Sequence, residues 1–250
     1  MAETAHAFWR LVDSGTVSPA RSTATDEAIL NARIRCTVPD TLHFYIRDRP
    51  SISIGYNKIV ADSVFMEEAE KRGVDIVRRL SGGSAIYTDQ GQLVFSVILD
   101  DSLLSSDIVK SYSEVCGAVI AGLSEFGIRA EHKPVNDILV DGSKISGSAQ
   151  LRRGGAVLHH GTLLVDTDVD IIASTIRPSG GAGGSKKLIC LRDLLGADPG
   201  MQSVKDAIAK GFGDSFDATI VPGRLTPAED AEIHELIEEK YGSRSWNYRL

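Results

Sequence analysis

A glycine-rich turn is the first place where this sequence could hold a charged ligand. The segment 78–84 (RRLSGGS) follows a β-rich run and places two arginines shortly before two glycines. Glycines let a backbone approach a ligand closely, and successive N–H groups can surround an anion. The segment therefore predicts an anion-binding turn, with a plain glycine turn and solvated arginines as the alternative. It matches neither a Walker A loop nor G-x-G-x-x-G, so ordinary NTPase and dinucleotide folds gain no support.

Lys144 is the second candidate, because it follows a predicted two-residue hairpin turn. Asp141-Gly142 favours a type I′ turn between strands at 137–140 and 143–146. The small residues at 147–149 come next and leave space above the strand. A cation beside such a floor suits the phosphate and carbonyl oxygens of a ligand. An exposed strand lysine is the alternative.

Two adjacent histidines, His159 and His160, lie within a predicted strand at 156–164. Successive strand residues face opposite sides of a sheet, so the two cannot easily ligate one metal. We expect one of them to point inward and form a hydrogen bond there, and the other to point out. No other His or Cys stands at metal-binding spacing, and no G-x-S-x-G elbow supports a serine hydrolase.

The elements that must position these residues alternate irregularly between strands and helices. β-rich runs and turn signals predict further strands at 42–47, 51–55, 75–79, 85–88 and 93–99. Apolar spacing predicts helices at 61–72 and 107–126, with Cys116 on the buried stripe of the second. Thr226, Pro227 and Glu229 form a capping box that opens another helix. Hairpins with segregated helices indicate an α+β fold with mixed sheets, in one domain spanning 1–250.

Length and composition limit the class of protein. The chain has 250 residues, 42% of them hydrophobic, and a formal net charge of −7, which is ordinary for a soluble globular protein. The acidic balance argues against a general binder of nucleic acid or membrane surfaces. Three cysteines without a C-x-x-C pair indicate reduced thiols and a cytoplasmic location. The N-terminus lacks a signal-peptide pattern, and no apolar run reaches the roughly 18 residues that span a membrane.

Taken together, and in their order along the chain, these segments resemble those of the lipoate–protein ligase A family. RRLSGGSAIYTDQGQLVFSVI is similar to one signature of these ligases, and NDILVDGSKISGSAQ followed by AVLHHGTLLVDTD is similar to their second. WRLVDSG, SISIGYNK and EKYGSRSWNYRL resemble further parts of the same catalytic domain, so the resemblance covers almost the whole chain. The superfamily also includes octanoyltransferases and, more distantly, biotin ligases. It implies an α+β fold in which a large mixed sheet and a smaller one enclose a tunnel for an acyl chain.

The resemblance also implies an activity and its residues. ATP and Mg²⁺ would activate lipoate or octanoate to an acyl-adenylate, and the acyl group would pass to one lysine of a lipoyl domain, as in 2-oxoacid dehydrogenase subunits or the glycine-cleavage H protein. Lys144 would be the catalytic residue that contacts the reacting carbonyl and phosphate oxygens. Asn136 and Asp137 would hold the nucleotide region, with Asp137 as the metal ligand. The other residues implied to line the acyl-adenylate site are Arg79, Ser81, Gly82, Gly83, Ser84, Gly147, Ser148, Ala149, His160, Gly161 and Thr162.

A closing segment is expected as well, because an acyl-adenylate must be kept from water. The glycine-rich stretch 178–187 (PSGGAGGSKK) is our candidate for this lid, with Lys186 and Lys187 reaching the phosphate. A surface loop without that role is the alternative.

Three features depart from the family pattern. Ser84 stands where the third glycine is usual, and Thr88 stands where a histidine is usual. The sequence also ends shortly after Trp246, where many bacterial ligases continue into an accessory domain that helps to form the adenylate. We therefore expect a separate accessory subunit, a compact site that activates the acid unaided, or transfer of preformed acyl-adenylate alone.

Two alternatives stay open. A cysteine-dependent octanoyltransferase would take octanoate from acyl carrier protein through a thioester, but 131–135 has no cysteine where one transferase branch carries its nucleophile. Cys190 is the candidate substitute, although its apolar flanks favour a buried structural thiol. A non-enzymatic lipoate-binding protein or regulatory subunit is the second alternative, and Lys144 together with the 78–84 turn weighs against it.

Overall fold

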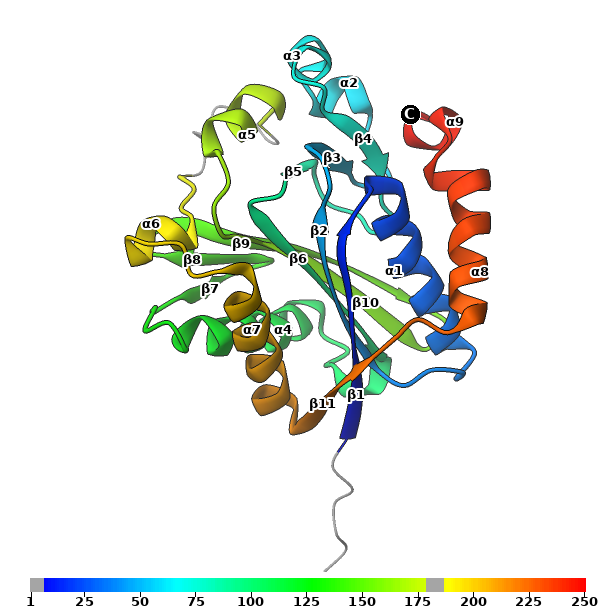
Figure 1. Cartoon of the computed structure of the whole chain (residues 1–250), viewed down its shortest axis with the longest axis vertical. Coiled ribbons are helices and arrows are strands. Elements are labelled where there is room, and N and C mark those ends of the chain that lie inside the picture. Colours follow the sequence, from blue (N-terminus) through cyan, green and yellow to red (C-terminus); the bar gives the residue numbers. More distant parts are fainter. Residues whose placement is uncertain (1–6, 179–186) are drawn as a thin grey trace, which may run out of the picture.

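Two β-sheets organise the molecule (Figure 1). The computed structural model describes residues 7–178 and 187–250. Within these residues the larger sheet has the strand order β11-β1-β2-β6-β10-β9-β8-β7, and the smaller has the order β4-β3-β5. The strands of the larger sheet are β1 (Ala7–Val17), β2 (Thr41–Arg47), β6 (Gln92–Asp100), β7 (Glu131–Lys133), β8 (Asp137–Val140), β9 (Ser143–Arg153), β10 (Ala156–Leu164) and β11 (Ala218–Gly223). Those of the smaller sheet are β3 (Ser51–Ile54), β4 (Asp75–Arg78) and β5 (Ile86–Thr88).

Both sheets combine parallel and antiparallel pairs, as the α+β prediction requires. In the larger sheet β1 runs parallel to β11 and β2, whereas β10 runs antiparallel to β6 and β9. In the smaller sheet β3 is parallel to β4 and antiparallel to β5. The predicted strands therefore exist, with ends that differ from the prediction by a few residues and with β9 extending well beyond position 146.

Helices cover both faces of the larger sheet (Figure 1). One face carries α4 and α7, which pack on each other, and the other carries α1, which packs on α8. The helices are α1 (Pro19–Ile34), α2 (Val60–Ser63), α3 (Met66–Lys71), α4 (Ile108–Ser124), α5 (Val169–Thr175), α6 (Leu191–Leu195), α7 (Met201–Phe216), α8 (Pro227–Leu236) and α9 (Arg244–Asn247), with a 3₁₀ turn at Asp101–Leu103 and a π-helical turn at Ile237–Tyr241. Among the residues described, no helix is both long and apolar enough to cross a bilayer.

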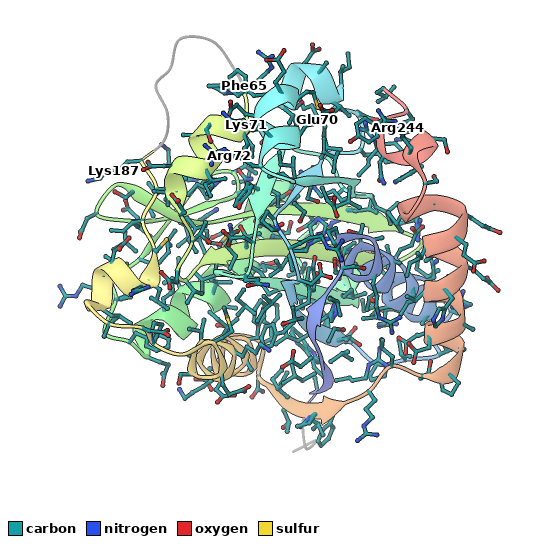
Figure 2. The ribbon with its side chains drawn as sticks, turned by 45° about the horizontal axis from the view of Figure 1, so that its top comes forward. Phe65, Glu70, Lys71, Arg72, Lys187 and Arg244 are labelled. Atoms are coloured by element: carbon teal, nitrogen blue, oxygen red, sulfur yellow. The ribbon has the colours of Figure 1, made fainter. Side chains whose placement is uncertain are left out.

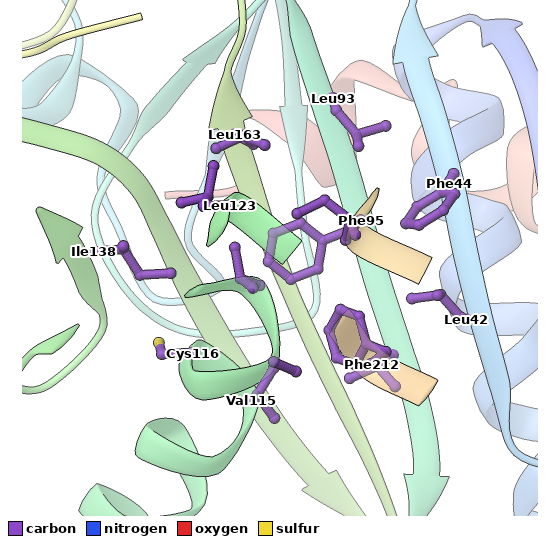
Figure 3. Packing of buried hydrophobic residues seen from close by; sticks show 14 of the residues in the cluster. Leu42, Phe44, Leu93, Phe95, Val115, Cys116, Leu123, Ile138, Leu163 and Phe212 are labelled. Atoms are coloured by element: carbon purple, nitrogen blue, oxygen red, sulfur yellow. The ribbon is translucent and has the colours of Figure 1, made fainter. Parts of the chain in front are cut away.

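The main hydrophobic core lies between the larger sheet and the pair α4 and α7 (Figure 3). Phe95 of β6 and Phe212 of α7 lie in it with ring centroids 6.0 Å apart. Cys116 lies on the buried stripe of α4 and is 2% exposed, which confirms the predicted core thiol. Gly211 lets the two helices approach closely, because a Cβ there would lie 2.3 Å from the carbonyl oxygen of Ala118. The opposite face carries a second apolar cluster beneath α1, which includes Ile98 and Leu158, together with buried polar side chains such as His43 and Ser96.

Local sequence signals were reliable where they rest on backbone geometry. Asp141 and Gly142 have φ angles of 48° and 75°, as a type I′ turn between β8 and β9 requires. Thr226 accepts a hydrogen bond from the Glu229 N–H, and the Glu229 side chain accepts one from the Thr226 N–H, so the predicted capping box opens α8.

The single helix predicted at 61–72 is wrong, because the chain forms two short helices there. The break falls at Val64, which forms a β-bridge with Ile176. The Phe65 N–H donates to the carbonyl oxygen of Thr175 instead of continuing a helix. Tertiary pairing with the segment after α5 therefore overrides the helical spacing of this stretch.

Arg78 connects the C-terminal segment to the chain that follows β3. Its side chain is fully buried and donates to the carbonyl oxygens of Gly55, Tyr56 and Lys58. It also donates to the carbonyl oxygens of Trp246 and Asn247. Arg78 is therefore part of the scaffold and does not supply charge to a ligand at the glycine turn.

Replacing Arg78 by Lys is expected to lower the free energy of unfolding by about 3 kcal/mol. An ammonium cannot reach five carbonyl oxygens, and a buried carbonyl that loses its partner costs on the order of 1–3 kcal/mol. Urea denaturation measures the effect, with the exposed Arg72→Lys as the matched control. A loss below about 0.5 kcal/mol, the usual range for surface changes, would contradict the scaffold role.

Candidate functional site

A cavity lies on the α1 side of the larger sheet, between that sheet and the smaller one. Its walls come from α1, both sheets, the turn after β4 and the chain that precedes β8. The residues that line it are Thr23, Asp26, Tyr45, Arg47, Ser53, Arg79, Gly83, Ser84, Ile86, Thr88, Val94, Asn136, Lys144, Gly147, Ser148, Ala149, His160, Gly161 and Thr162. The cavity thus brings together two segments that the sequence singled out separately, the glycine turn and the hairpin with Lys144.

Most of the predicted site residues line this cavity, and a few do not. Ser81 and Asp137 lie behind the wall, where each contacts a lining residue, His160 and Lys144 respectively. Gly82 is exposed at the turn, outside the cavity lining. The proposed lid at 178–187 lies almost wholly outside the described residues. Of its two lysines only Lys187 is described, and its side chain points outward, away from the body of the molecule (Figure 2).

Lys144 supplies a fixed cation to one end of the cavity. Its Nζ lies 2.7 Å from Oδ1 of Asp137, whose side chain is 5% exposed. The Lys144 backbone is held too, because its N–H donates to the carbonyl oxygen of Lys187 and its own carbonyl accepts from the Ile189 N–H. The ammonium therefore has a defined position next to space that a ligand can enter.

Two glycines of β9 and β10 allow close packing around Lys144 and the strand beside it. A Cβ on Gly147 would lie 2.5 Å from Nζ of Lys144. A Cβ on Gly161 would lie 2.5 Å from the ring of Phe95. Gly147 therefore leaves room for the Lys144 ammonium, and Gly161 leaves room on the opposite face of the sheet for the Phe95 ring of the main core.

Arg79 builds the glycine turn and is not free to bind a phosphate. Its guanidinium donates to the carbonyl oxygens of Ser53, Gly82 and Ser84 and to the hydroxyl of Ser81. Burial lowers the pKa of Arg79 to about 10, which still leaves it charged at neutral pH. Gly83 has a φ angle of +91°, a conformation that glycine adopts without strain. Within this turn, only the backbone and Ser84 are therefore left to bind an anion.

A buried network around Asp26 holds the cavity wall, and the sequence analysis missed it. The Asp26 carboxylate is 2.9 Å from Nδ1 of His43 and 3.3 Å from Nδ1 of His160, and it accepts a hydrogen bond from the Ser96 hydroxyl. On its other side, Nε2 of His160 is 2.6 Å from the Ser81 hydroxyl. One carboxylate therefore connects α1, β2, β6 and β10, and through His160 it reaches the glycine turn.

The pKa of Asp26 follows from these contacts. Burial alone would raise it, but hydrogen bonds and charge from His160 and His43 outweigh burial and hold the pKa well below its usual value. Asp26 is thus ionised at neutral pH. The available signal was the position of Asp26 in ATDEAIL, where two acidic residues interrupt an otherwise uncharged helical stretch.

His159 and His160 face opposite sides of the sheet, as predicted, but neither is a free surface side chain. His159 is fully buried, and its Nδ1 lies 3.0 Å from the amide oxygen of Gln150. Burial lowers the pKa of His159 to about 3, so this ring is neutral. His160 lines the cavity. The expectation that one of the pair points out is therefore wrong, because the second histidine faces the cavity.

Within residues 7–178 and 187–250, no cluster of side chains forms a metal site by itself. Mg²⁺ prefers oxygen ligands and is held by carboxylates together with substrate phosphates. The Asp137 carboxylate is paired with Lys144, and the described part of the chain contains no group of three His, Cys, Asp or Glu that could hold a metal. Asp137 as a metal ligand stays a prediction, and we derive no step through a metal.

Comparison with known proteins identifies the class to which this fold and cavity belong. Residues 18–213 match the family model of the lipoyl protein ligase A/B catalytic domain. Because the match covers most of the chain, the protein belongs to the lipoyl protein ligase A/B catalytic-domain family. Octanoyltransferase LipM of Symbiobacterium thermophilum is 32% identical over 270 aligned residues, which cover 96% of this chain and 98% of LipM.

Solved structures agree with this assignment. Protein Ta0514 of Thermoplasma acidophilum with bound lipoic acid superposes with a TM-score of 0.85 at 28% identity, covering 96% of this chain and 99% of the other. A structure from a study of a bi-partite lipoate protein ligase and its E2 lipoyl domain, from the same organism, gives 0.86 at 27%, covering 97% of each chain. Lipoate-protein ligase A bound with ATP gives 0.84 at 27%, covering 98% and 99%. The predicted family and fold are confirmed.

Replacing Asp26 by Asn is expected to lower the free energy of unfolding at pH 7 by about 1–3 kcal/mol, because the amide cannot replace the carboxylate toward His43 and His160. The folded-state pKa of Asp26 lies below the unfolded value, so its stabilisation is complete above that unfolded value, near pH 4, and disappears as the pH falls through the folded value. The difference between wild type and variant should therefore shrink below about pH 4.

Urea denaturation between pH 3 and pH 8 measures this difference, with the exposed Asp62→Asn as the control. A pH-independent difference would contradict a role that depends on the ionised carboxylate.

Proposed function

We propose that the protein transfers an octanoyl or lipoyl group to a lysine amine of a lipoyl-domain protein, with the acyl chain in the cavity. The observation that carries this proposal is the Lys144 ammonium, held by buried Asp137 at one end of a cavity between the two sheets. The named relatives support the acyl groups, because one is an octanoyltransferase and another was solved with lipoic acid. The bi-partite ligase of Thermoplasma acidophilum, which is described together with its E2 lipoyl domain, supports the class of acceptor.

The chemistry of the step fits a fixed cation. The acceptor nitrogen forms a bond with the acyl carbon, the bond from that carbon to its leaving group breaks, and one proton leaves the nitrogen. Negative charge grows on the carbonyl oxygen during the attack and on the leaving group as it departs. A preorganised ammonium stabilises both charges more than it stabilises the ground state, and this difference lowers the barrier.

The acyl donor distinguishes two possible activities, a ligase that uses an acyl-adenylate and a transferase that works through a cysteine thioester. Transfer through a cysteine thioester needs a thiol at the acyl carbon. Among the described residues no cysteine lines the cavity. Cys190 is 3% exposed, its thiol donates to the carbonyl oxygen of Thr167, and burial raises its pKa. Burial likewise raises the pKa of Cys116 to about 12, far from that of a nucleophilic thiolate.

We therefore propose direct transfer from an activated donor, with no acyl group on the protein. The names of the curated relatives favour octanoyl transfer, whereas the ligase solved with ATP favours an acyl-adenylate made from lipoate or octanoate. Both donors place their reacting carbonyl beside Lys144. ATP use, Mg²⁺ use and an accessory subunit that forms the adenylate remain predictions for this chain.

The intact mass of an apo lipoyl domain separates these donors. The protein is incubated with the domain and either lipoate plus ATP and Mg²⁺, synthetic lipoyl-adenylate, or octanoyl-acyl carrier protein. We expect acylation from the adenylate. Acylation from lipoate only when ATP is present would establish a ligase that activates its own acid, and acylation from octanoyl-acyl carrier protein alone would establish the transferase reading. No acylation in any mixture would contradict the proposed function.

Replacing Lys144 by Met is expected to lower the transfer rate by about a hundredfold to a thousandfold, as the loss of one oxyanion contact does in other enzymes. Methionine keeps the length of the side chain but removes its charge. Initial rates with one acyl donor measure the loss, circular dichroism checks the fold, and the exposed Lys110→Met serves as the control. Full activity of the Lys144→Met variant would rule out the proposed role.

The Cys190→Ser variant is expected to keep its transfer rate within about a factor of two of wild type. A buried thiol that donates to a backbone carbonyl can be replaced by a hydroxyl that does the same. The same mass assay measures the rate. A folded variant without activity would support the cysteine-dependent transferase in place of direct transfer.

A further inference from the structure

Arg47 is a buried cation whose hydrogen-bonding capacity is mostly unused. It ends β2, lines the cavity and is 2% exposed. Its Nε and Nη1 form no hydrogen bond with any residue in the described ranges. Its Nη2 lies 3.5 Å from the Thr23 hydroxyl, and the guanidinium carbon lies 5.4 Å from the centre of the Tyr45 ring. Buried donors without partners are costly, so such a group in a cavity wall points to a ligand.

Arg47 and Lys144 lie at opposite ends of the cavity. Strand pairing places Tyr45 of β2 beside Val94 of β6, Val94 beside Thr162 of β10, and Thr162 beside Gly147 of β9, and all four residues line the cavity. Three strand spacings of about 4.8 Å separate β2 from β9, which gives a path of roughly 14 Å. An extended eight-carbon acyl chain spans about 9 Å, so it fits along this row of residues.

The polar character of the far end does not suit a plain alkyl chain. Thr23, Ser53 and Thr88 line the cavity together with Arg47. Burial lowers the pKa of Arg47, and contact with Tyr45 and the charge of Asp26 oppose that effect. Asp26 is occupied by His43, His160 and Ser96, which leaves Nε and Nη1 of Arg47 for another acceptor.

We infer that the β2 end of the cavity is a subsite for a hydrogen-bond acceptor carried on the distal end of a medium-chain acyl group. A terminal methyl group would leave the Arg47 N–H groups buried and unpaired. A terminal oxygen would accept a hydrogen bond from them, and a ring sulfur would accept a weaker one. This inference rests on the proposed function, because that function places the reacting carbonyl at the Lys144 end.

The test compares two neutral amides that differ at one end only, N-methyloctanamide and 8-hydroxy-N-methyloctanamide. Neutral heads prevent a carboxylate from binding to Arg47 in the reverse orientation. Isothermal titration calorimetry of the full chain measures the Kd of each. We expect the hydroxyl compound to bind about tenfold tighter to the wild type, the scale of one hydrogen bond to a charged group.

The Arg47→Leu variant should lose this preference and bind N-methyloctanamide at least as tightly as the wild type does. Arg47→Lys, which keeps a charged donor, should retain part of the preference, and it provides the comparison if the leucine variant does not fold. Equal binding of both amides to the wild type, or an unchanged preference in either folded variant, would overturn the subsite alone. Absence of binding by both amides would overturn the subsite together with the proposed function.

Discussion

The buried carboxylate of Asp26 is the interaction on which the cavity depends. It comes from α1 and holds His43 of β2, Ser96 of β6 and His160 of β10, so one side chain fixes a helix against three strands. A charge can be buried in this way because its hydrogen bonds outweigh the cost of desolvation, and its low pKa reflects that balance. Through His160 the same carboxylate reaches Ser81 and the glycine turn. The glycine turn and β10 are therefore held in one wall of the cavity.

Three cations around the cavity have different roles because their partners differ. Arg79 donates to the glycine turn and to the carbonyl oxygen of Ser53 in β3, and its role is to hold that turn against β3. Lys144 is held by one carboxylate and keeps donors for a reacting oxygen. Arg47 keeps two nitrogen atoms, Nε and Nη1, without a described partner at the far end of the cavity. All three side chains are positively charged and lie near the cavity. Their hydrogen bonds show that Arg79 is structural, whereas Lys144 and Arg47 can bind a ligand.

Much of this arrangement follows from local sequence signals. The type I′ turn at Asp141-Gly142 and the α8 capping box were predictable because they depend on a few adjacent residues. The cavity residues around Lys144 were predictable because their small side chains and order resemble a known family. Val64 was misread because its pairing with Ile176 is long-range, and Asp26 and Arg47 were missed because only folding brings them into the cavity. The role of Arg78 could not be read from sequence, since its five acceptors are backbone carbonyls from distant segments.

A crystal structure with a non-hydrolysable sulfamoyl analogue of octanoyl-adenylate tests the central claim most directly. Our account predicts that the carbonyl oxygen of the ligand lies within about 3.2 Å of Nζ of Lys144, a hydrogen-bonding distance. It also predicts that the acyl chain crosses β10 and β6 toward β2. An acyl chain bound elsewhere, or a carbonyl group directed away from Lys144 toward a cysteine, would contradict the account.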